Sequence, residues 1–407
     1  MSRKLLETDG AEWVKKGIIS PEQHAQLLDL YPPEKPTIGL LPLLGSLLIA
    51  LSALSLVAAN WQVLPEMVRL GLLLGSLTSA YVSAEYFLRR QYESLGLGLV
   101  GLGLLLFGAS IILTSQMYQL IGYDLTGLLA WAVVGILLTW LYSSRFLFLL
   151  TVIIGGIVQG YNTGQLGVFS YFTAALTAGG LGYYWWRRPD SVLGGVLATG
   201  LLWQTALLIN HLHVKITWFF IPAMLIYTAG DWQADRPAAR ALQGPPLVAA
   251  FLFTLGLALF GEADAYTDRL RPPLLAYLAA LGAVLALSVR GKKLRGRLSG
   301  ATDWLLLLPG FSLPGGLPLT VGTVVELYAY SGSVLARAHQ EQNQDRVTLG
   351  TVLFVLTTAV AYFRLTWGFM DKSLFFLLGG ILLFGLSWLL RRRAAKTFSV
   401  KNVNQAP

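Results

Sequence analysis

The sequence predicts an all-α protein, a polytopic transmembrane helix bundle of about 12–14 spans preceded by a short N-terminal cytosolic helix pair. Composition is the first reason. The 407 residues are 55% hydrophobic and only 13% charged, whereas a soluble domain carries roughly 25% charged residues. The second reason is that the apolar residues form continuous runs rather than alternating patterns. Lipid offers no water to the backbone, so such runs must close their hydrogen bonds as helices.

Residues 1–36 form the predicted cytosolic helix pair. Trp13 and Val14 mark the apolar side of the first helix, and Gly17 suits its C-terminal end. The run SPEQ at 20–23 has the residue types of an N-cap, a first-turn proline and a capping box, so it predicts the start of the second helix. We expect no cleavable signal, because polar residues rather than an apolar core follow the N-terminus.

Hydrophobic runs then follow almost without pause, and a membrane crossing needs about 20 such residues. We place candidate spans at 38–59, 68–88, 95–115, 125–142, 146–162, 168–186, 191–210, 216–229, 246–261, 273–289, 347–363 and 373–390.

The stretch 302–336 is ambiguous. Its break at Pro314-Gly315-Gly316 allows two short crossing helices or a re-entrant hairpin, which is allowed only where protein or water covers it. We favour two crossings, which gives about 14 helices rather than 12.

Basic residues give the predicted orientation. They cluster in every second connection, most strongly in RGKKLRGR at 290–297 and in the tail after residue 390. Basic residues favour the cytoplasmic side, so both termini are expected there. The formal charge of +9 is explained by these span ends, so the bilayer is the expected partner and nucleic acid is not.

Several motifs have a plain structural interpretation. GLGLVG at 96–101 has the spacing of a dinucleotide fingerprint, but it lies inside an apolar run, so we predict helix packing instead. The glycine pairs 71/75 and 156/160 are interpreted in the same way. His211-x-His213 is more typical of an interfacial polar turn than of a metal site. No Cys, HExxH motif, P-loop or Ser-His-Asp order is present, so we expect no metal, cofactor or catalytic residues, and enzyme activity is not favoured.

Polar and aromatic residues gather where several predicted spans end on the outward side. An interfacial aromatic belt explains Trp and Tyr, but it does not require Asn and Gln, which are costly near lipid unless they are hydrogen-bonded. Belt residues with structural hydrogen bonds are one interpretation, and a shared ligand cavity is the other. The ligand-binding hypothesis names Asn60, Trp61, Gln62, Gln116, Tyr118, Gln119, Tyr123, Asp124, Gln159, Tyr161 and Asn162. Gln165, Asn210, His211 and His213 fall on the same predicted face.

Glu326 is the strongest candidate for an intramembrane acid, next to Tyr328 and Tyr330 in the interrupted segment. Such an acid is a functional-site hypothesis by default. The structural alternative is an ion pair with a neighbour such as Arg337.

The chain resembles two bacterial membrane families of unknown function. Trp13 to Gln23, AANWQVLP at 58–65 and SQMYQL at 115–120 resemble DUF2157. LPGFSLPGG at 308–316 and AYFRLTWGFMDKSLFFLLGG at 361–380 resemble DUF4401. The resemblance implies a first membrane domain at 37–243, a second at 244–397 and a cytosolic tail at 398–407. It also implies a bacterial inner-membrane location and a small periplasmic-facing partner protein with a GDYxxLxY motif, but no activity.

Two functions remain open from the sequence. One is a transporter-like protein, or one that handles a lipid or envelope ligand through the outward amide and aromatic cavity. The other is a non-catalytic membrane scaffold or sensor that binds the small partner protein.

Overall fold

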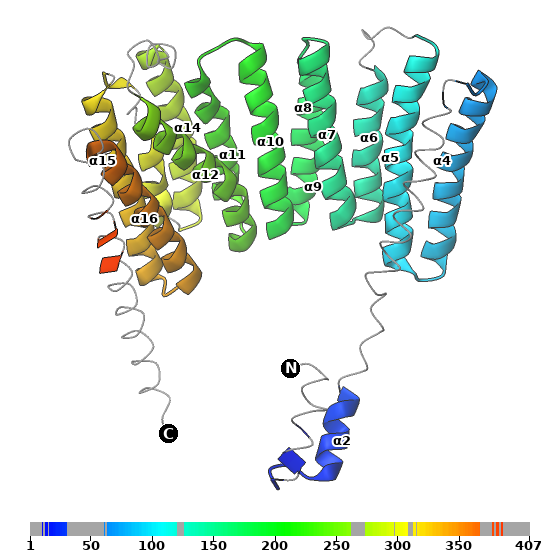
Figure 1. Ribbon diagram of the computed structural model, residues 1–407, viewed down its shortest axis with the longest axis horizontal. Helices are drawn as coiled ribbons and strands as arrows, with labels where there is room; N and C mark the ends of the chain where they lie inside the picture. The colour runs from blue at the N-terminus through cyan, green and yellow to red at the C-terminus, as the bar shows by residue number, and fades with distance from the viewer. Residues whose placement is uncertain are drawn as a thin grey trace. The chain divides into compact units, whose positions relative to one another are not determined.

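The computed structural model describes residues 10, 13–14, 16–30, 61, 63–119, 126–261, 273–296, 298–307, 312–314, 316–366, 377, 380–381 and 384–385. Two compact units, residues 1–74 and 75–407, are described separately. All regular elements of the described residues are helical (Figure 1). The predicted span at 38–59 lies outside them, and so does nearly all of that at 373–390.

The first unit contains the predicted capping box. Gln23 N–H donates to Ser20 Oγ at 3.1 Å, and Ser20 N–H donates to Gln23 Oε1 at 2.9 Å. This reciprocal pair starts α2 (Pro21–Leu30) and confirms the predicted helix start. Gly17 has a φ of +69°, and its N–H donates to Val14 O at 3.1 Å. It ends the preceding turn as predicted, because glycine adopts this conformation without steric cost.

Helix α4 (Glu66–Arg89) leads into a group made by α5 (Glu93–Met117), α6 (Thr126–Tyr142) and α7 (Arg145–Gln165). Each of α5, α6 and α7 packs against the other two. The indole of Trp131 on α6 donates to Leu104 O on α5 at 2.8 Å. It lies where a side chain at Gly108 would stand, so this glycine permits close contact between α5 and α6.

The predicted span at 168–186 is one helical run with a change of pitch. It consists of α8 (Tyr171–Leu176), a π-helical turn η1 (Thr177–Leu181) and α9 (Gly182–Arg187). Helix α10 (Ser191–His211) follows, and the Asp190 side chain caps its start by accepting from Val192 and Leu193 N–H. Helix α10 packs against α7 on one side and against α12 on the other.

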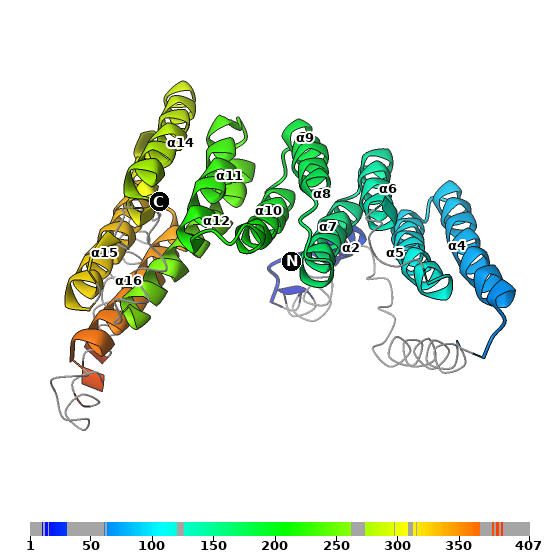
Figure 2. The ribbon, with the colours of Figure 1, turned by 90° about the horizontal axis from the view of Figure 1, so that it is seen from above.

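The remaining elements form the C-terminal bundle. They are η2 (Ile216–Phe219), α11 (Phe220–Trp232), α12 (Arg236–Phe260), α14 (Leu274–Leu294), η3 (Leu298–Leu307), α15 (Leu317–Gln340) and α16 (Gln344–Thr366). Helix α11 packs on α12 and α14, and α15 packs on α12 and α16. Their shared core includes Met224, Phe251 and Leu327. The view from above shows these elements crossing one another (Figure 2).

Eight described helices are long and apolar enough to cross a membrane, namely α4, α5, α7, α10, α12, α14, α15 and α16. Helix α6 is apolar but shorter. The passes predicted at 168–186 and 216–229 combine α-helix with π or 3-10 turns. An all-α polytopic bundle is therefore confirmed, while the total number of spans stays a prediction.

The interrupted segment differs from the two short α-helices that we expected. Its first part is the 3-10 helix η3, and its second is the 24-residue helix α15, which begins after Gly316 (φ +83°). Gly316 N–H donates to Gly261 O at the end of α12, whereas Asp303 pairs with Arg337 near the other end of α15. These ends are about 30 Å apart at the rise of an α-helix, so Asp303 and Gly316 lie at opposite ends of α15.

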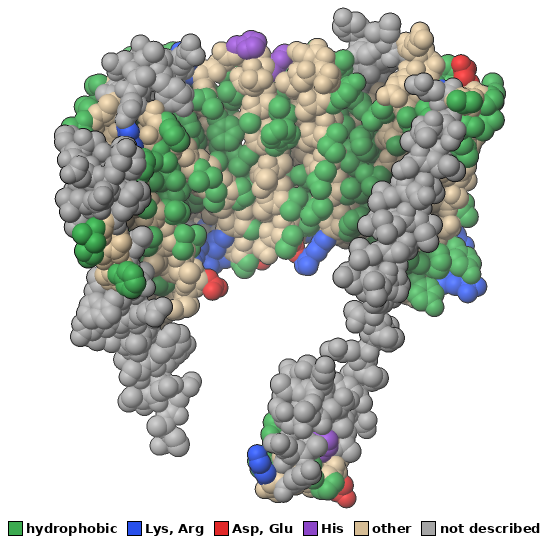
Figure 3. Space-filling view, in the orientation of Figure 1, with side chains coloured by type: hydrophobic (Ala, Val, Ile, Leu, Met, Phe, Trp, Pro, Cys, Tyr) green, Lys and Arg blue, Asp and Glu red, His purple; other side chains and the backbone are tan. Residues whose placement is uncertain are grey.

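The described helices of the second unit have a basic end and an opposite end. The basic end holds the connections α4–α5, α6–α7, α9–α10, α11–α12 and α15–α16, together with the C-terminus of α14. Figure 3 shows most of the visible Lys and Arg side chains along the lower edge of the helical part and His at the upper edge. The structure therefore keeps the alternation of basic connections that the sequence predicts.

Candidate functional site at the two ends of helices α11 and α12

A cavity of about 510 Å³ lies at the opposite end, between α10, η2, α11 and α12. We call it the His213 cavity. It is lined by Ala206, Ile209, Asn210, His213, Val214, Ile216, Phe219, Phe220, Ala249 and Phe253. Most of these side chains are apolar, and the Phe220 and Phe253 rings pack with their centroids 4.8 Å apart.

Two polar side chains enter this apolar surface from one turn. His213 has a φ of +50°, a left-handed conformation that is uncommon for a residue with a side chain. Its N–H donates to Asn210 O at 3.2 Å. The polar turn predicted for this segment is therefore present, its place at the membrane interface stays a prediction, and it brings an amide and an imidazole to the wall of one cavity.

A second pocket, of about 130 Å³, lies at the basic end of the same two helices. We call it the Lys292 pocket. Its lining consists of Tyr227, Asp231, Arg236, Ala239, Arg240, Gln243, Lys292, Gly296, Gly300, Asp303, Arg337, Glu341 and Arg346. Helices α11 and α12 therefore line an apolar cavity at one end and a charged pocket at the other.

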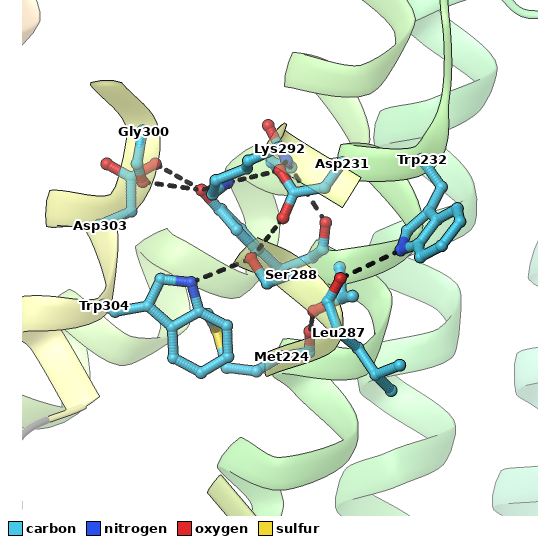
Figure 4. A network of polar contacts seen from close by, with 12 residues as sticks. Met224, Asp231, Trp232, Leu287, Ser288, Lys292, Gly300, Asp303 and Trp304 are labelled. Atoms are coloured by element: carbon cyan, nitrogen blue, oxygen red, sulfur yellow. Dashed lines mark hydrogen bonds and ion pairs between the residues drawn. The ribbon is translucent and has the colours of Figure 1, made fainter. Parts of the chain in front are cut away.

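The floor of the Lys292 pocket is a buried ion pair. Lys292 on α14 and Asp231 on α11 have side chains that are only 2% and 3% exposed, and they face each other in Figure 4. Lys292 Nζ also donates to Tyr227 Oη at 2.9 Å and lies 4.5 Å from the centre of that ring. The ammonium group thus has a carboxylate, a hydroxyl and an aromatic face as partners.

Hydrogen bonds extend this pair across the bundle. Asp231 accepts from Ser288 Oγ at 2.5 Å and from Gln243 Nε2 at 2.7 Å. Trp304 Nε1 donates to Ser288 Oγ at 3.2 Å, as Figure 4 shows. Tyr227 Oη donates to Asp303 at 2.7 Å. A buried charge is costly without such partners, so this network joins α11, α12, α14 and η3 in one arrangement.

The rim of the Lys292 pocket is formed by charged side chains that reach solvent. Glu341 accepts from Arg346 at 2.8 Å and from Arg240 at 3.4 Å. Arg240 and Arg346 are 44% and 32% exposed, compared with 17% for Arg337 and 2% for Lys292. The exposed fraction of the basic side chains therefore decreases from the rim of the pocket to its floor.

A groove of about 1000 Å³ runs between α7 and α10. Gly156 and Gly160 line it, and a side chain at either would meet only the Trp203 ring, at 3.4 and 3.9 Å. Gly156 O accepts from the Trp203 indole of α10 at 3.2 Å, so the predicted contact between helices is present at Gly156, beside the groove that both glycines line. At 71/75, an added Cβ meets no described atom within 4 Å. In GLGLVG, Gly96 faces Leu88 and Gly101 faces Phe146, so these two glycines do serve helix packing.

The predicted outward residues do not form one cavity in the described part of the chain. Asn60, Gln62, Tyr123 and Asp124 lie outside it. Trp61 belongs to the first unit, where the Arg69 guanidinium lies 5.8 Å from its ring. Gln116, Tyr118 and Gln119 are exposed around the end of α5, and Tyr161 lines the groove between α7 and α10. Binding of a ligand by these residues stays a prediction.

Gln159 and Asn162 are buried inside the helix packing rather than on an outward surface. With its amide oriented by its neighbours, Gln159 donates to Ser170 O at 3.2 Å and accepts from Ser170 N–H at 3.1 Å. Ser170 is the N-cap of α8, so Gln159 holds the start of that helix against α7. Hydrophobic periodicity does not distinguish this position from a cavity wall, because both require one polar residue on an apolar helix.

Glu326 is buried within the middle of α15, at 6% exposure. Its Oε1 atom has no hydrogen-bond partner among the described residues. The proposed ion pair with Arg337 is wrong, because Arg337 pairs with Asp303 and lies about 16 Å further along the helix.

The residue pattern does not predict the Lys292 pocket. Lys292 lies in the basic run at 290–297, which indicates a cytoplasmic connection, but α14 continues to Leu294 and buries Lys292. A usable signal was Asp231, an acid at the end of an apolar run. Its partner is distant in sequence and on another helix, so the residue pattern alone could not supply the pair.

Comparison with known proteins supports the membrane character of the N-terminal part. Residues 11–148 match the family model described as Predicted membrane protein (DUF2157). No curated protein and no solved structure matches the chain. The match confirms the predicted resemblance over that range, and the resemblance to DUF4401 stays a prediction. Because the match ends within α7, both the His213 cavity and the Lys292 pocket lie beyond it.

Proposed function

We propose that the protein is a multi-pass bacterial inner-membrane protein that holds an amphiphilic envelope ligand in the His213 cavity. The cavity itself carries this proposal. Its volume of about 510 Å³ falls in the range of about 300–1000 Å³ that is typical of small-molecule sites. Phenylalanine rings offer an apolar surface, and Asn210 and His213 offer hydrogen bonds to a polar head, as in a lipid or glycolipid fragment.

The orientation belongs to the same proposal. Basic residues favour the cytoplasmic side, so the basic end and both termini would face the cytoplasm and the His213 cavity would face the periplasm. Gln119→Cys tests this, because the chain has no cysteine of its own. We expect labelling by a membrane-impermeant thiol reagent in intact cells with a permeable outer membrane. Labelling only after lysis contradicts the orientation.

The ligand is tested by filling the cavity. Ala249 lines it, whereas its neighbour Val248 does not and is 58% exposed. Native mass spectrometry of the gently purified protein should show a retained small molecule that Ala249→Leu loses and the matched control Val248→Leu keeps. Equal retention in both variants, or no retained molecule in the unaltered protein, would overturn the proposal.

Glu326 is the residue that we assign to coupling, if the ligand is moved rather than only held. It lies on α15, which packs on α12, and α12 contributes to the wall of the His213 cavity. An ionisable side chain buried within a membrane-spanning helix marks a candidate site of proton transfer. Uptake of a proton at Glu326 is therefore the step that would accompany ligand movement.

A non-catalytic scaffold is the second candidate. It is favoured by the exposure of Gln116, Tyr118 and Gln119, which form no part of the pockets described above. The expected occupant is the small periplasmic-facing protein that the family resemblance implies. Replacing Tyr118 and Gln119 by Ala should then release that protein and leave retention of the small molecule unchanged.

A further inference from the structure

The rim of the Lys292 pocket carries an excess of positive charge. On the floor, Lys292 pairs with Asp231 and Arg337 pairs with Asp303. The other charged lining residues are Arg236, Arg240, Arg346 and Glu341. The rim thus has three positive charges and one carboxylate, which leaves an excess of two positive charges.

The other nearby acids do not cancel this excess. Asp235, the N-cap of α12, directs its carboxylate to Ala238 N–H at 2.8 Å. Asp345 at the start of α16 is exposed, and neither acid lines the pocket. Glu341 receives Arg240 and Arg346 on the same oxygen, Oε2. No ion pair involves Arg236 within the described residues, and it lies one helical turn before Arg240, on the same face.

We propose that this rim binds a phosphate group, with Arg236, Arg240 and Arg346 as its ligands. The planar guanidinium group matches phosphate oxygens in paired hydrogen bonds. The volume of about 130 Å³ equals that of about four water molecules, which suits one phosphate group. The floor is occupied by its own ion pairs, so the phosphate stays at the rim.

The same chemistry fits two sources. A phosphate can belong to an anionic phospholipid, because basic pockets between helices at the cytoplasmic side bind such headgroups, or it can be free in solution. This proposal does not depend on the His213 cavity, which lies at the other end of α12.

Binding to the purified full-length protein in a neutral detergent tests the proposal. Isothermal titration would use inorganic phosphate, a short-chain phosphatidylglycerol and, for comparison, a short-chain phosphatidylcholine. The variants are Arg236→Gln, Arg240→Gln and Arg346→Gln, each expected to weaken binding at least about tenfold through loss of a charge-assisted hydrogen bond. Arg145→Gln is the matched control, because Arg145 lies at the basic end and pairs with Asp190 away from the pocket.

The outcomes separate the sources. Binding of inorganic phosphate that the rim variants weaken supports a free phosphate ligand. Binding of phosphatidylglycerol alone, weakened in the same way, supports a lipid headgroup. Binding of neither, or equal weakening by Arg145→Gln, overturns the proposal. Unchanged thermal unfolding midpoints show that the variants are folded, and unchanged binding in Ala249→Leu keeps this result separate from the fate of the His213 cavity.

Discussion

The region around α7, α8 and α10 and the region around α11, α14 and η3 both bury polar side chains, but of different kinds. The first buries neutral groups, including Gln159, Asn162 and Gln204. The second buries the ions Asp231 and Lys292. A neutral amide can be satisfied by the backbone of one residue, as Gln159 is by the C=O and N–H of Ser170. An ion requires an opposite charge and further hydrogen bonds, and these come from several helices.

This difference indicates in which region a single substitution should reduce stability most. Loss of one amide affects one helix start, whereas loss of one ion leaves its partner buried and uncompensated. The charged region should therefore be the more sensitive of the two to single substitutions, and the expected losses of stability decrease from the buried ion pair to the neutral groups.

Lys292→Met should have the largest effect. It leaves Asp231 without its counter-ion in a buried site, and breaking such a pair costs about 3–5 kcal/mol of unfolding free energy. Arg145→Met removes an ion pair to Asp190 in which Arg145 is 73% exposed, so it should cost no more than about 1 kcal/mol. Thermal unfolding in detergent measures both, and equal losses would remove the distinction between buried and exposed pairs.

Gln159→Leu should be less costly. It removes both hydrogen bonds to the Ser170 backbone and leaves the Ser170 N–H without this partner, at about 1–3 kcal/mol, whereas Ser170 O still accepts from Ala174 N–H. Gln165→Leu, at an exposed position on the same helix, is the control and should be nearly neutral. An equal loss of stability in Gln159→Leu and Lys292→Met would show that buried neutral groups are as sensitive to substitution as buried ions.

Gly108→Ala and Gly160→Ala compare a packed glycine with one that lines a groove. An added methyl at Gly108 runs into the Trp131 ring, and such overpacking costs about 1–3 kcal/mol. At Gly160 the nearest atom lies 3.9 Å away, on Trp203. Alanine there should be neutral or stabilising by up to about 1 kcal/mol, because it favours the helix. If both variants lowered the unfolding midpoint, the groove beside Gly160 would have to be closed in solution.

Glu326→Gln should have the smallest effect on stability. Glutamine keeps the shape of the side chain and cannot ionise, and Oε1 of Glu326 has no hydrogen-bond partner to lose among the described residues, so we expect a change below about 1 kcal/mol. Ligand movement in reconstituted vesicles should nevertheless be abolished if Glu326 takes up the coupling proton. A large loss of folded protein, with movement intact in what remains, would assign Glu326 to structure instead.

The sequence predicted the helix starts and ends well where the residues that form them lie within one short segment. The capping box at 20–23 and the glycine turn at 17 formed as expected, and α4, α5, α7, α10 and α16 begin and end within about three residues of the predicted runs. Helix α12 begins at Arg236, well before the run predicted at 246–261, and α14 continues to Leu294, beyond the run predicted at 273–289. The interrupted segment was harder, because prolines and glycines mark a break without specifying the helix type on either side of it. The first half became a 3-10 helix and the second a long α-helix.

The candidate sites show the limit of the sequence more clearly. Asn210 and His213 were placed on one face with other amides, and they line a cavity. Gln159 and Asn162, placed on that same face, are buried inside the packing. Their positions differ by rotation about the helix axis relative to neighbouring helices. That rotation is set by contacts between distant residues, which a single sequence does not reveal.

By itself, the sequence determined a multi-pass helical membrane protein with basic connections at alternate helix ends, because hydrophobicity and charge act locally along the chain. The tertiary structure was needed to show that Asp231 and Lys292 meet, that Arg337 pairs with Asp303 rather than with Glu326, and that Arg240 and Arg346 share Glu341 at a pocket that Arg236 also lines. The physical reason is that a buried or clustered charge is stabilised by whatever faces it from other helices, and helix packing alone sets which groups those are.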